Sequence, residues 1–316
     1  MKTQPIYGTP LVVSRIAFGC MRFPPGQSDV IRAVRTALDE GINFFDHANV
    51  YQRGRAEEAF SIMWREVPGL RDRIILQSKC GIRPAGDPTP DTPTRFDFSY
   101  QHIRDSVDGS LRRLQTDHLD ILLLHRPDPL GDPEEVAKAF AELKAAGKVS
   151  FFGVSNHTGL QIELLKTALS VPLVVNQLEI SVLHTTLLNA GVITNQDNPP
   201  YPVRGEGTLE YCYAHKITLQ AWGPLAKGAA SGKPLDGAEE RVVKTAEVVE
   251  TIARERGVSR DAVLIAWLLR HPARIQPIIG TMNPERIKGC CQAETFELSR
   301  EEWYTLFAAG RGSKMP

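Results

Sequence analysis

Short apolar runs alternate with longer amphipathic segments along most of the chain. The short runs are rich in β-branched residues and have the length of buried strands, whereas the longer segments repeat their apolar residues at helical spacing. One such segment carries Val136, Ala139, Phe140 and Leu143 and stops before Gly147, a residue type favoured just past a helix terminus. The short runs lie at 15–19, 43–48, 74–79, 119–125, 151–156, 173–179, 218–222 and 275–280. The pattern therefore predicts eight strands separated by helices.

Alternation of strand and helix predicts parallel pairing, and the continuous apolar run at 121–124 fits a sheet that is buried on both faces. Eight such strands close into a barrel inside a ring of helices. We therefore predict an α/β fold, a (β/α)8 TIM barrel, as a single domain over residues 1–316. A doubly wound open sheet is the alternative, but the G-x-G-x-x-G motif expected after its first strand is absent beyond Gly19. Residues 310–316 are expected to form a flexible tail.

The composition indicates a globular protein without a strong charge. Apolar residues make up 42% of the chain, and 37 Lys and Arg residues balance 37 Asp and Glu residues. Because zero net charge provides no long-range field to recruit nucleic acid or an anionic membrane, we expect a small-molecule partner. No apolar stretch approaches the roughly 20 residues of a membrane helix, and residues 1–8 lack the apolar core of a signal peptide. The chain is therefore expected to be cytoplasmic.

The cysteines indicate neither disulfides nor a metal site. Cys20, Cys80, Cys212, Cys290 and Cys291 form an odd set without a C-x-x-C motif, and the eight histidines include no H-x-H pair. We therefore predict no bound metal. Cys80 directly follows Lys79, but neighbouring side chains of a strand point to opposite faces. We therefore assign Cys80 no role.

Polar residues stand at the ends of three successive predicted strands. Asp46 and Tyr51 come at and after the end of one strand, Lys79 ends the next, and His125 ends the one after that. Barrels build their active sites at the carboxyl ends of their strands, so we expect these four side chains to lie together. Strand alternation sends Asp46 and His47 to opposite faces, and His47 is therefore assigned a structural position.

These four residue types suit the reduction of a carbonyl group. A buried Lys79 needs a counter-charge, which Asp46 on the adjacent strand can supply. An ammonium within about 4 to 6 Å is expected to lower the pKa of Tyr51 by about one to three units and make it a usable acid near neutral pH. His125 can donate a second hydrogen bond to an oxygen held by Tyr51. Each residue taken alone is more often structural, and the prediction rests on their coincidence.

Motifs across nearly the whole chain resemble the aldo-keto reductase family, and most closely a bacterial subgroup of predicted oxidoreductases. They are FDHANVY at 45–51, LQSKCG at 76–81, LDILLLHRPDP at 119–129, GKV at 147–149, GVSN at 153–156, NQLE at 176–179 and IIGT at 278–281. The resemblance implies a barrel that holds NADP(H) without a Rossmann domain and transfers hydride to an aldehyde or ketone. Asp46, Tyr51, Lys79 and His125 match the catalytic tetrad of the family, in which the Tyr is the acid.

The resemblance also implies a set of cofactor contacts. Ser155, Asn156 and Gln177 match the group that hydrogen-bonds the nicotinamide carboxamide, and Trp222 matches an aromatic ring that stacks on it. Ser-Asn after a strand is also a good helix N-cap, and Trp222 also fits an ordinary core position. Residues of the pyrophosphate loop are matched by Gly223, Leu225 and Lys227, and those of the 2′-phosphate segment by Gly280, Thr281, Asn283 and Arg286.

The choice between NADP and NAD stays open at this stage, because the chain differs from many relatives at Gly280, Gly289 and Cys290. We favour NADP, mainly because Arg286 would otherwise be a surface cation with no assigned role. Gln52 replaces a Gly that usually follows the catalytic Tyr in relatives, and His47 replaces a common Thr. Both changes are expected to alter loop packing or substrate access.

The leading hypothesis is an NADP(H)-dependent reductase of small aldehydes or ketones, with Tyr51 as general acid. The alternative is a cofactor-binding redox-sensing or regulatory protein on the same barrel. Metal-dependent hydrolysis is disfavoured because clustered ligands are lacking. The substrate and the oligomeric state stay open. Loop residues that can line an apolar substrate pocket are Met21, Phe23, Phe96, Phe98 and Tyr201, and Arg22 and Arg95 can meet an anionic substrate.

Overall fold

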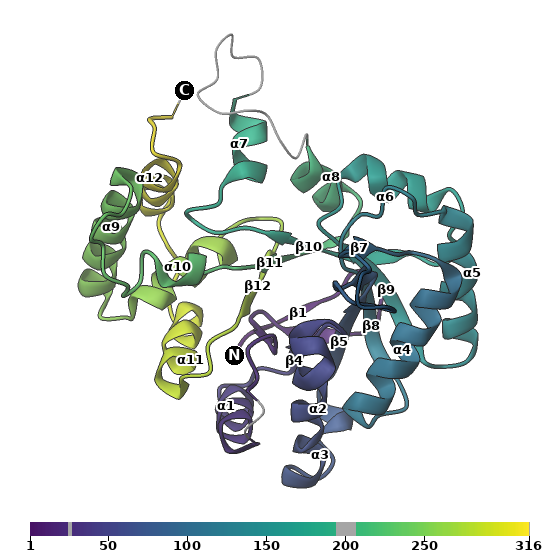
Figure 1. Cartoon of the computed structure of the whole chain (residues 1–316). Coiled ribbons are helices and arrows are strands. Elements are labelled where there is room, and N and C mark those ends of the chain that lie inside the picture. The colour runs from purple at the N-terminus through teal and green to yellow at the C-terminus, as the bar shows by residue number, and fades with distance from the viewer. Residues whose placement is uncertain (25–26, 194–206, 316) are drawn as a thin grey trace.

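Eight parallel strands form a closed barrel in the computed structural model, which describes residues 1–24, 27–193 and 207–315 (Figure 1). Around the barrel the strands follow the order β10, β11, β12, β3, β4, β5, β8, β9. Their bounds are β3 (Ala17–Gly19), β4 (Phe44–Asp46), β5 (Ile75–Cys80), β8 (Leu119–Leu124), β9 (Val149–Ser155), β10 (Leu173–Glu179), β11 (Thr218–Trp222) and β12 (Gln276–Ile279). Each strand overlaps one of the eight predicted runs, and the (β/α)8 fold class is confirmed.

The helices form an outer ring around this barrel (Figure 1). They are α1 (Gln27–Asp39), α2 (Arg55–Ser61), α3 (Met63–Glu66), α4 (Tyr100–Leu114), α5 (Pro133–Ala145), α6 (Gly159–Lys166), α7 (Thr186–Val192), α8 (Thr208–Ala214), α9 (Glu240–Arg256), α10 (Arg260–Leu269), α11 (Pro284–Cys291) and α12 (Arg300–Arg311). Short 3₁₀ turns are η1 (Tyr51–Gly54), η2 (Arg71–Arg73), η3 (Ala226–Gly228) and η4 (Gln292–Glu294). None of these described helices combines the length and the apolar character needed to cross a membrane.

Local sequence explains where α5 begins and which face it buries. The Asp132 side chain caps the first turn by accepting a hydrogen bond from the Glu134 backbone, and Pro133 occupies the first helical position. The apolar residues predicted to face the core from this helix are all buried. Gly147 follows the helix with a φ of +69°, a conformation that favours glycine.

Two antiparallel hairpins outside the barrel were not predicted. The first joins β1 (Thr3–Pro5) to β2 (Val12–Ser14), and the second joins β6 (Ile82–Arg83) to β7 (Arg95–Phe96). Val13 of the first hairpin packs with Phe44 and Ile121 in the apolar cluster that fills the barrel interior. This hairpin therefore contributes to the barrel core at the end where the strands begin.

Strand alternation divides the side chains of β4 as predicted. Phe44 belongs to the interior cluster, whereas Phe45 belongs to the larger cluster between the barrel and the helices. Asp46 faces the interior with Phe44, and His47 lies on the outer side against Phe60. The structural position predicted for His47 is confirmed.

The tail predicted at residues 310–316 begins too early. Helix α12 continues through Arg311, which is 4% exposed, and ends at the Gly312 cap. Gly310 packs closely on the segment that precedes α7. A Cβ added to Gly310 would lie 1.8 Å from the backbone oxygen of Val182. Gly310 therefore permits a close contact between segments and does not begin the tail.

Candidate active site

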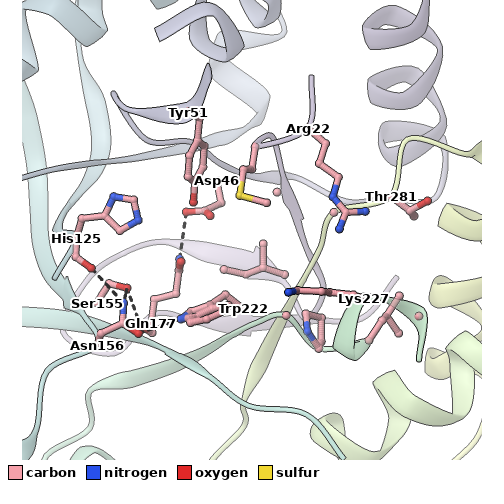
Figure 2. Close-up of a pocket in the computed structure, with 18 of the residues that line it drawn as sticks. Arg22, Asp46, Tyr51, His125, Ser155, Asn156, Gln177, Trp222, Lys227 and Thr281 are labelled. Atoms are coloured by element: carbon pink, nitrogen blue, oxygen red, sulfur yellow. Dashed lines mark hydrogen bonds between the residues drawn. The ribbon is translucent and has the colours of Figure 1, made fainter. Parts of the chain in front are cut away.

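A cavity of about 300 Å³ opens at the carboxyl ends of the barrel strands. Its lining includes the last residues of four strands, Gly19, Asp46, Ser155 and Trp222. Figure 2 shows Tyr51 and His125 on the same side of this cavity as Asp46. The structure thus brings three of the four predicted site residues to one pocket, and the fourth, Lys79, contacts two of them, Asp46 and Tyr51.

The register of the barrel explains why these side chains meet. Asp46 pairs with Gln77 of β5, so Lys79, two residues further along β5, points to the same interior face. His125 follows directly after β8, which is the next strand beside β5. Tyr51 begins η1, the turn that follows β4. Three adjacent strands therefore deliver the four residues, as predicted.

The Lys79 ammonium is the centre of this polar group, and its side chain is completely buried. Its Nζ lies 2.8 and 2.7 Å from the two carboxylate oxygens of Asp46, 2.8 Å from the backbone oxygen of His47 and 3.1 Å from the Tyr51 hydroxyl. These contacts use the full donor capacity of an ammonium group. The ion pair predicted between Asp46 and Lys79 is confirmed.

The direction predicted for the pKa of Tyr51 is wrong. Burial raises the pKa of Tyr51 above its ordinary value, and the Lys79 ammonium, which acts to lower it, offsets burial only in part. Burial acts to lower the pKa of Lys79, but Asp46 and Tyr51 together reverse this and leave that pKa above its ordinary value. At neutral pH Tyr51 is therefore a protonated phenol beside a protonated amine.

His125 is a neutral imidazole in this setting. Burial, with help from the charges of Lys79 and Arg126, holds the pKa of His125 well below its ordinary value. Its ring lies edge-on to the ring of Tyr51, with centroids 5.8 Å apart. Nδ1 is buried without a hydrogen-bond partner among the described residues. A neutral histidine can donate from one ring nitrogen only, so it can act as a hydrogen-bond donor without carrying a charge.

The residues expected to contact a nicotinamide form one hydrogen-bonded group. The Ser155 hydroxyl donates to the backbone oxygen of Gln177 over 2.8 Å, and Asn156 Nδ2 donates to Ser155 Oγ over 3.0 Å. Trp222 Nε1 donates to Asn156 Oδ1 over 3.1 Å. The helix-cap alternative is wrong, because Thr158 rather than Ser155 or Asn156 caps α6.

Most residues expected on the phosphate side also line the pocket. They are Gly223, Leu225, Lys227, Gly280, Thr281 and Arg286. Figure 2 shows Lys227 and Thr281 at the side opposite to Tyr51, together with Arg22. Arg22 and Lys227 therefore lie at one side of the pocket and Tyr51 at the other.

Two expectations on the phosphate side need correction. Asn283 does not line the pocket; its Oδ1 accepts backbone hydrogen bonds from Glu285 and Arg286 and so caps α11. Arg286 has a structural role, because Nε and Nη2 each lie 2.8 Å from an oxygen of Asp261. This pairing holds the guanidinium in place. It also removes the argument for NADP that the sequence alone provided.

The predicted substrate-loop residues divide between pocket and core. Met21 and Arg22 line the pocket, whereas Phe23 and Phe98 are buried in the core. Phe96 pairs in the second hairpin, Arg95 donates to the backbone oxygen of Asp87, and neither belongs to the pocket lining. Tyr201 lies outside the described residues.

Sequence reasoning missed Arg126, which also lines the pocket and lies over the Trp222 ring at 6.0 Å. The available signal was its position directly after His125, at a strand end.

Gln52 connects the site to the loop between β3 and α1. Its backbone is left-handed, with a φ of +50°, which explains why a glycine is favourable at this position. Its Nε2 donates to the backbone oxygens of Phe23 and, over 3.3 Å, Met21. The Gln52 side chain therefore contacts this loop, and its effect on loop packing relative to a glycine stays a prediction.

The cysteines have the properties of buried structural thiols. All five are free and buried, and burial raises the pKa of Cys80 to about 12. Within residues 1–24, 27–193 and 207–315, no three His, Cys, Asp or Glu side chains cluster in a way that would hold a metal ion.

Comparisons with known proteins agree with the fold and the motifs. The model of the aldo/keto reductase family matches residues 15–310. The 6-dehydroglucose reductase of Agrobacterium fabrum is 37% identical over 310 residues, covering 96% of this chain and 97% of that protein. The uncharacterized oxidoreductase YcsN of Bacillus subtilis is 36% identical over 314 residues, covering 97% of each.

A solved structure, the holo form of the aldo-keto reductase AKR11C1 from Bacillus halodurans, shares the fold. It has a TM-score of 0.79 at 23% identity and covers 100% of this chain and 97% of that one. Family model and relatives cover nearly the full length, and the chain belongs to the aldo/keto reductase family.

Proposed function

We propose that this chain is an NADP(H)-dependent reductase that converts small aldehydes or ketones to alcohols. The observation that carries this proposal is the 3.1 Å hydrogen bond between Lys79 Nζ and the Tyr51 hydroxyl, at a pocket of a size to admit a small molecule. An oxidoreductase of this family requires a proton donor beside the carbonyl oxygen that it reduces. Tyr51 is a protonated phenol in contact with the pocket.

The chain's own residues supply the proton and stabilise the charge that follows. Tyr51 donates its hydroxyl proton to the carbonyl oxygen and is left as a phenolate, whose charge the Lys79 ammonium stabilises. Asp46 keeps Lys79 charged and in place. Neutral His125 donates a second hydrogen bond that orients the carbonyl. The hydride comes from NADPH when that cofactor is bound.

The pocket chemistry suits a nicotinamide dinucleotide. Ser155, Asn156 and Gln177 line the pocket beside the flat ring of Trp222, and their side-chain oxygens can accept hydrogen bonds from a carboxamide NH₂. Lys227 and Arg286 provide positive charge for phosphates at the other side. Members of the family generally use a nicotinamide cofactor. We favour NADP over NAD because cations rather than carboxylates line that side of the pocket.

Two observations bear on the substrate class, namely the pocket lining and the name of one relative. A carbonyl compound at Tyr51 would lie near Arg126, a hydrogen-bond donor that suits a substrate with several oxygen atoms. The Agrobacterium relative is named for its action on 6-dehydroglucose, an oxidised sugar. We therefore place oxidised sugars first among the compounds to be tested.

A cofactor-oxidation screen tests the proposal. Purified protein is offered aldehydes, ketones, quinones and 6-dehydroglucose with NADPH and NADH side by side, and the loss of reduced cofactor is followed by absorbance. We expect turnover of at least one carbonyl class, with NADPH preferred. Tight binding of NADPH without turnover of any compound would contradict the reductase proposal and favour the redox-sensing alternative.

A further inference from the structure

Four glutamines form a buried layer between the pocket and the apolar interior of the barrel. Gln77, Gln177, Gln220 and Gln276 come from β5, β10, β11 and β12, and each is at most 2% exposed. The register pairs Gln177 with Gln220 and Gln220 with Gln276 across neighbouring strands. Asp46 of β4 pairs with Gln77 in the same way. We call Gln77, Gln177, Gln220 and Gln276 the amide layer.

Each amide of the layer has a defined donor and acceptor atom, and the orientation is fixed first at Gln276. Gln276 Nε2 lies 2.7 Å from the backbone oxygen of Ser14, which can only accept, so this amide must present its nitrogen there. Its oxygen then accepts from Gln220 Nε2 over 2.9 Å. The Gln220 oxygen in turn accepts from Nε2 of Gln77 and Gln177, over 2.9 and 3.0 Å.

The other end of the amide layer is fixed by a carboxylate. Nε2 of Gln77 and Gln177 also donate to Asp46 Oδ1, over 2.6 and 3.1 Å. A carboxylate accepts only, so both ends of the layer require the same amide orientation. Gln77 keeps this orientation although its Oε1 is buried without a partner among the described residues.

These constraints determine which atom Gln177 can offer to a ligand. Both hydrogens of its Nε2 are directed at acceptors inside the barrel, Asp46 and Gln220. A flipped amide would turn its oxygen toward two other acceptor oxygens and leave both of them without a donor. Gln177, which lines the pocket, is therefore left with its carbonyl oxygen as the group for a ligand.

We propose that Gln220 and Gln276 are positioning residues that hold the Gln177 amide with its oxygen toward the pocket, so that the site selects a ligand carrying an N–H donor at this point. Neither residue lines the pocket; Gln220 contacts Gln177 directly, and Gln276 acts through Gln220. The inference rests on the proposed function, because the donor would be the carboxamide NH₂ of a nicotinamide. It adds a physical reason why the site distinguishes that NH₂ from a group of similar shape.

Binding of two cofactors tests this orientation. The probes are NADPH and its 3-acetylpyridine analogue, which has a methyl group in place of the carboxamide NH₂ and keeps the carbonyl oxygen. Their dissociation constants are measured by fluorescence titration, without turnover. We expect wild-type protein to bind NADPH about tenfold more tightly, as suits one hydrogen bond. Equal binding of both probes would overturn the proposal.

Variants of the amide layer separate positioning from packing. Gln220→Leu removes an acceptor for Gln177, and we expect the preference for NADPH to fall to about threefold or less. Gln220→Glu keeps an acceptor at this point and should retain the preference, although it introduces a buried charge. A packing role alone would change the binding of NADPH and of its analogue by the same factor in both variants, so the preference would not move. Loss of preference in Gln220→Glu with retention in Gln220→Leu would therefore overturn the proposal.

The matched control is Gln4→Leu, which removes a buried glutamine of β1 that donates to the Arg274 backbone oxygen over 3.2 Å, outside the amide layer. It should keep the tenfold preference, whereas Gln276→Leu should lose part of it. If Gln220→Glu does not fold, the inference is tested by comparing Gln220→Leu, Gln276→Leu and Gln4→Leu. Equal ratios of the two dissociation constants in all three variants would overturn the inference. Wild-type protein that binds neither probe would overturn the proposed function as well.

Discussion

Lys79 Nζ donates a hydrogen bond to the Tyr51 hydroxyl over 3.1 Å while it is held by the Asp46 carboxylate at 2.7 Å. Burial and this contact act on Tyr51 at different points of the reaction. Before transfer, burial keeps the phenol protonated, since its pKa is raised. After transfer, the ammonium faces the new phenolate directly. Tyr51 is therefore a proton donor at rest, and Lys79 stabilises its conjugate base after transfer.

The buried ion pair should contribute strongly to stability. We expect Lys79→Met and Asp46→Asn each to lower the free energy of unfolding by about 3 to 5 kcal/mol, because each leaves one buried group without its main partner. The double variant should lose clearly less than the sum of the two. Urea denaturation of the four proteins measures this, and additive losses would show that the pair is not coupled.

Removing the ring nitrogens of His47 should stabilise the protein. Neither nitrogen has a hydrogen-bond partner among the described residues, and the ring packs against Phe60 at 4.8 Å. We expect His47→Phe to raise the free energy of unfolding by about 1 to 2 kcal/mol at neutral pH, because two unsatisfied polar atoms leave the core.

The advantage of His47→Phe should depend on pH. Burial lowers the pKa of His47 from 6.5 to about 3 in the folded protein. As pH falls below 6.5 the unfolded chain takes up this proton first, so the wild type loses stability between pH 6.5 and about 3. Between pH 7 and pH 5 the advantage should therefore grow by about 2 kcal/mol. Chemical denaturation at both values checks this, and a constant advantage would contradict it.

Gln52 should matter more for ligand binding than for stability. Gln52→Gly relieves a left-handed backbone but loses the hydrogen bonds to the loop that carries Met21 and Arg22. We expect the free energy of unfolding to change by less than about 1 kcal/mol and NADPH to bind several-fold more weakly. Arg53→Gly, at a φ of +57°, is the control for relief of strain. Equal binding by the two variants would remove the role given to the Gln52 side chain.

Arg286 should distinguish NADPH from NADH. Its guanidinium lines the pocket and is held by Asp261, so it can meet a phosphate without further ordering. We expect Arg286→Ala to weaken NADPH binding about tenfold and to leave NADH binding nearly unchanged. Lys288→Ala removes another cation of α11, one that pairs with Glu285, and serves as the control. Equal weakening for both cofactors would contradict the preference for NADP.

Local patterns were sufficient to predict the strands and the four residues at their ends. The period of two along 43–48 placed Asp46 and His47 on opposite faces, because alternation depends only on neighbouring residues. Family motifs then indicated most of the pocket lining. Both kinds of signal lie within short stretches of sequence.

Other features depend on contacts between distant segments. Gln220 and Gln276, each within a mainly apolar run, did not indicate an amide layer, because only the closed barrel brings Gln276 to Ser14. The pairing of Arg286 with Asp261 depends on how α10 and α11 pack. For Tyr51, the sequence indicated the neighbouring charge but not the degree of burial, and burial decides the direction of its pKa shift.

The most direct measurement of the central claim is the turnover of Tyr51→Phe with NADPH and the best carbonyl substrate. This variant removes the hydroxyl that donates the proton and keeps the ring in the pocket. We expect kcat/KM to fall by about 100- to 10,000-fold while the dissociation constant of NADPH stays within about twofold of the wild type. Turnover equal to that of the wild type would contradict the role of Tyr51 as the acid.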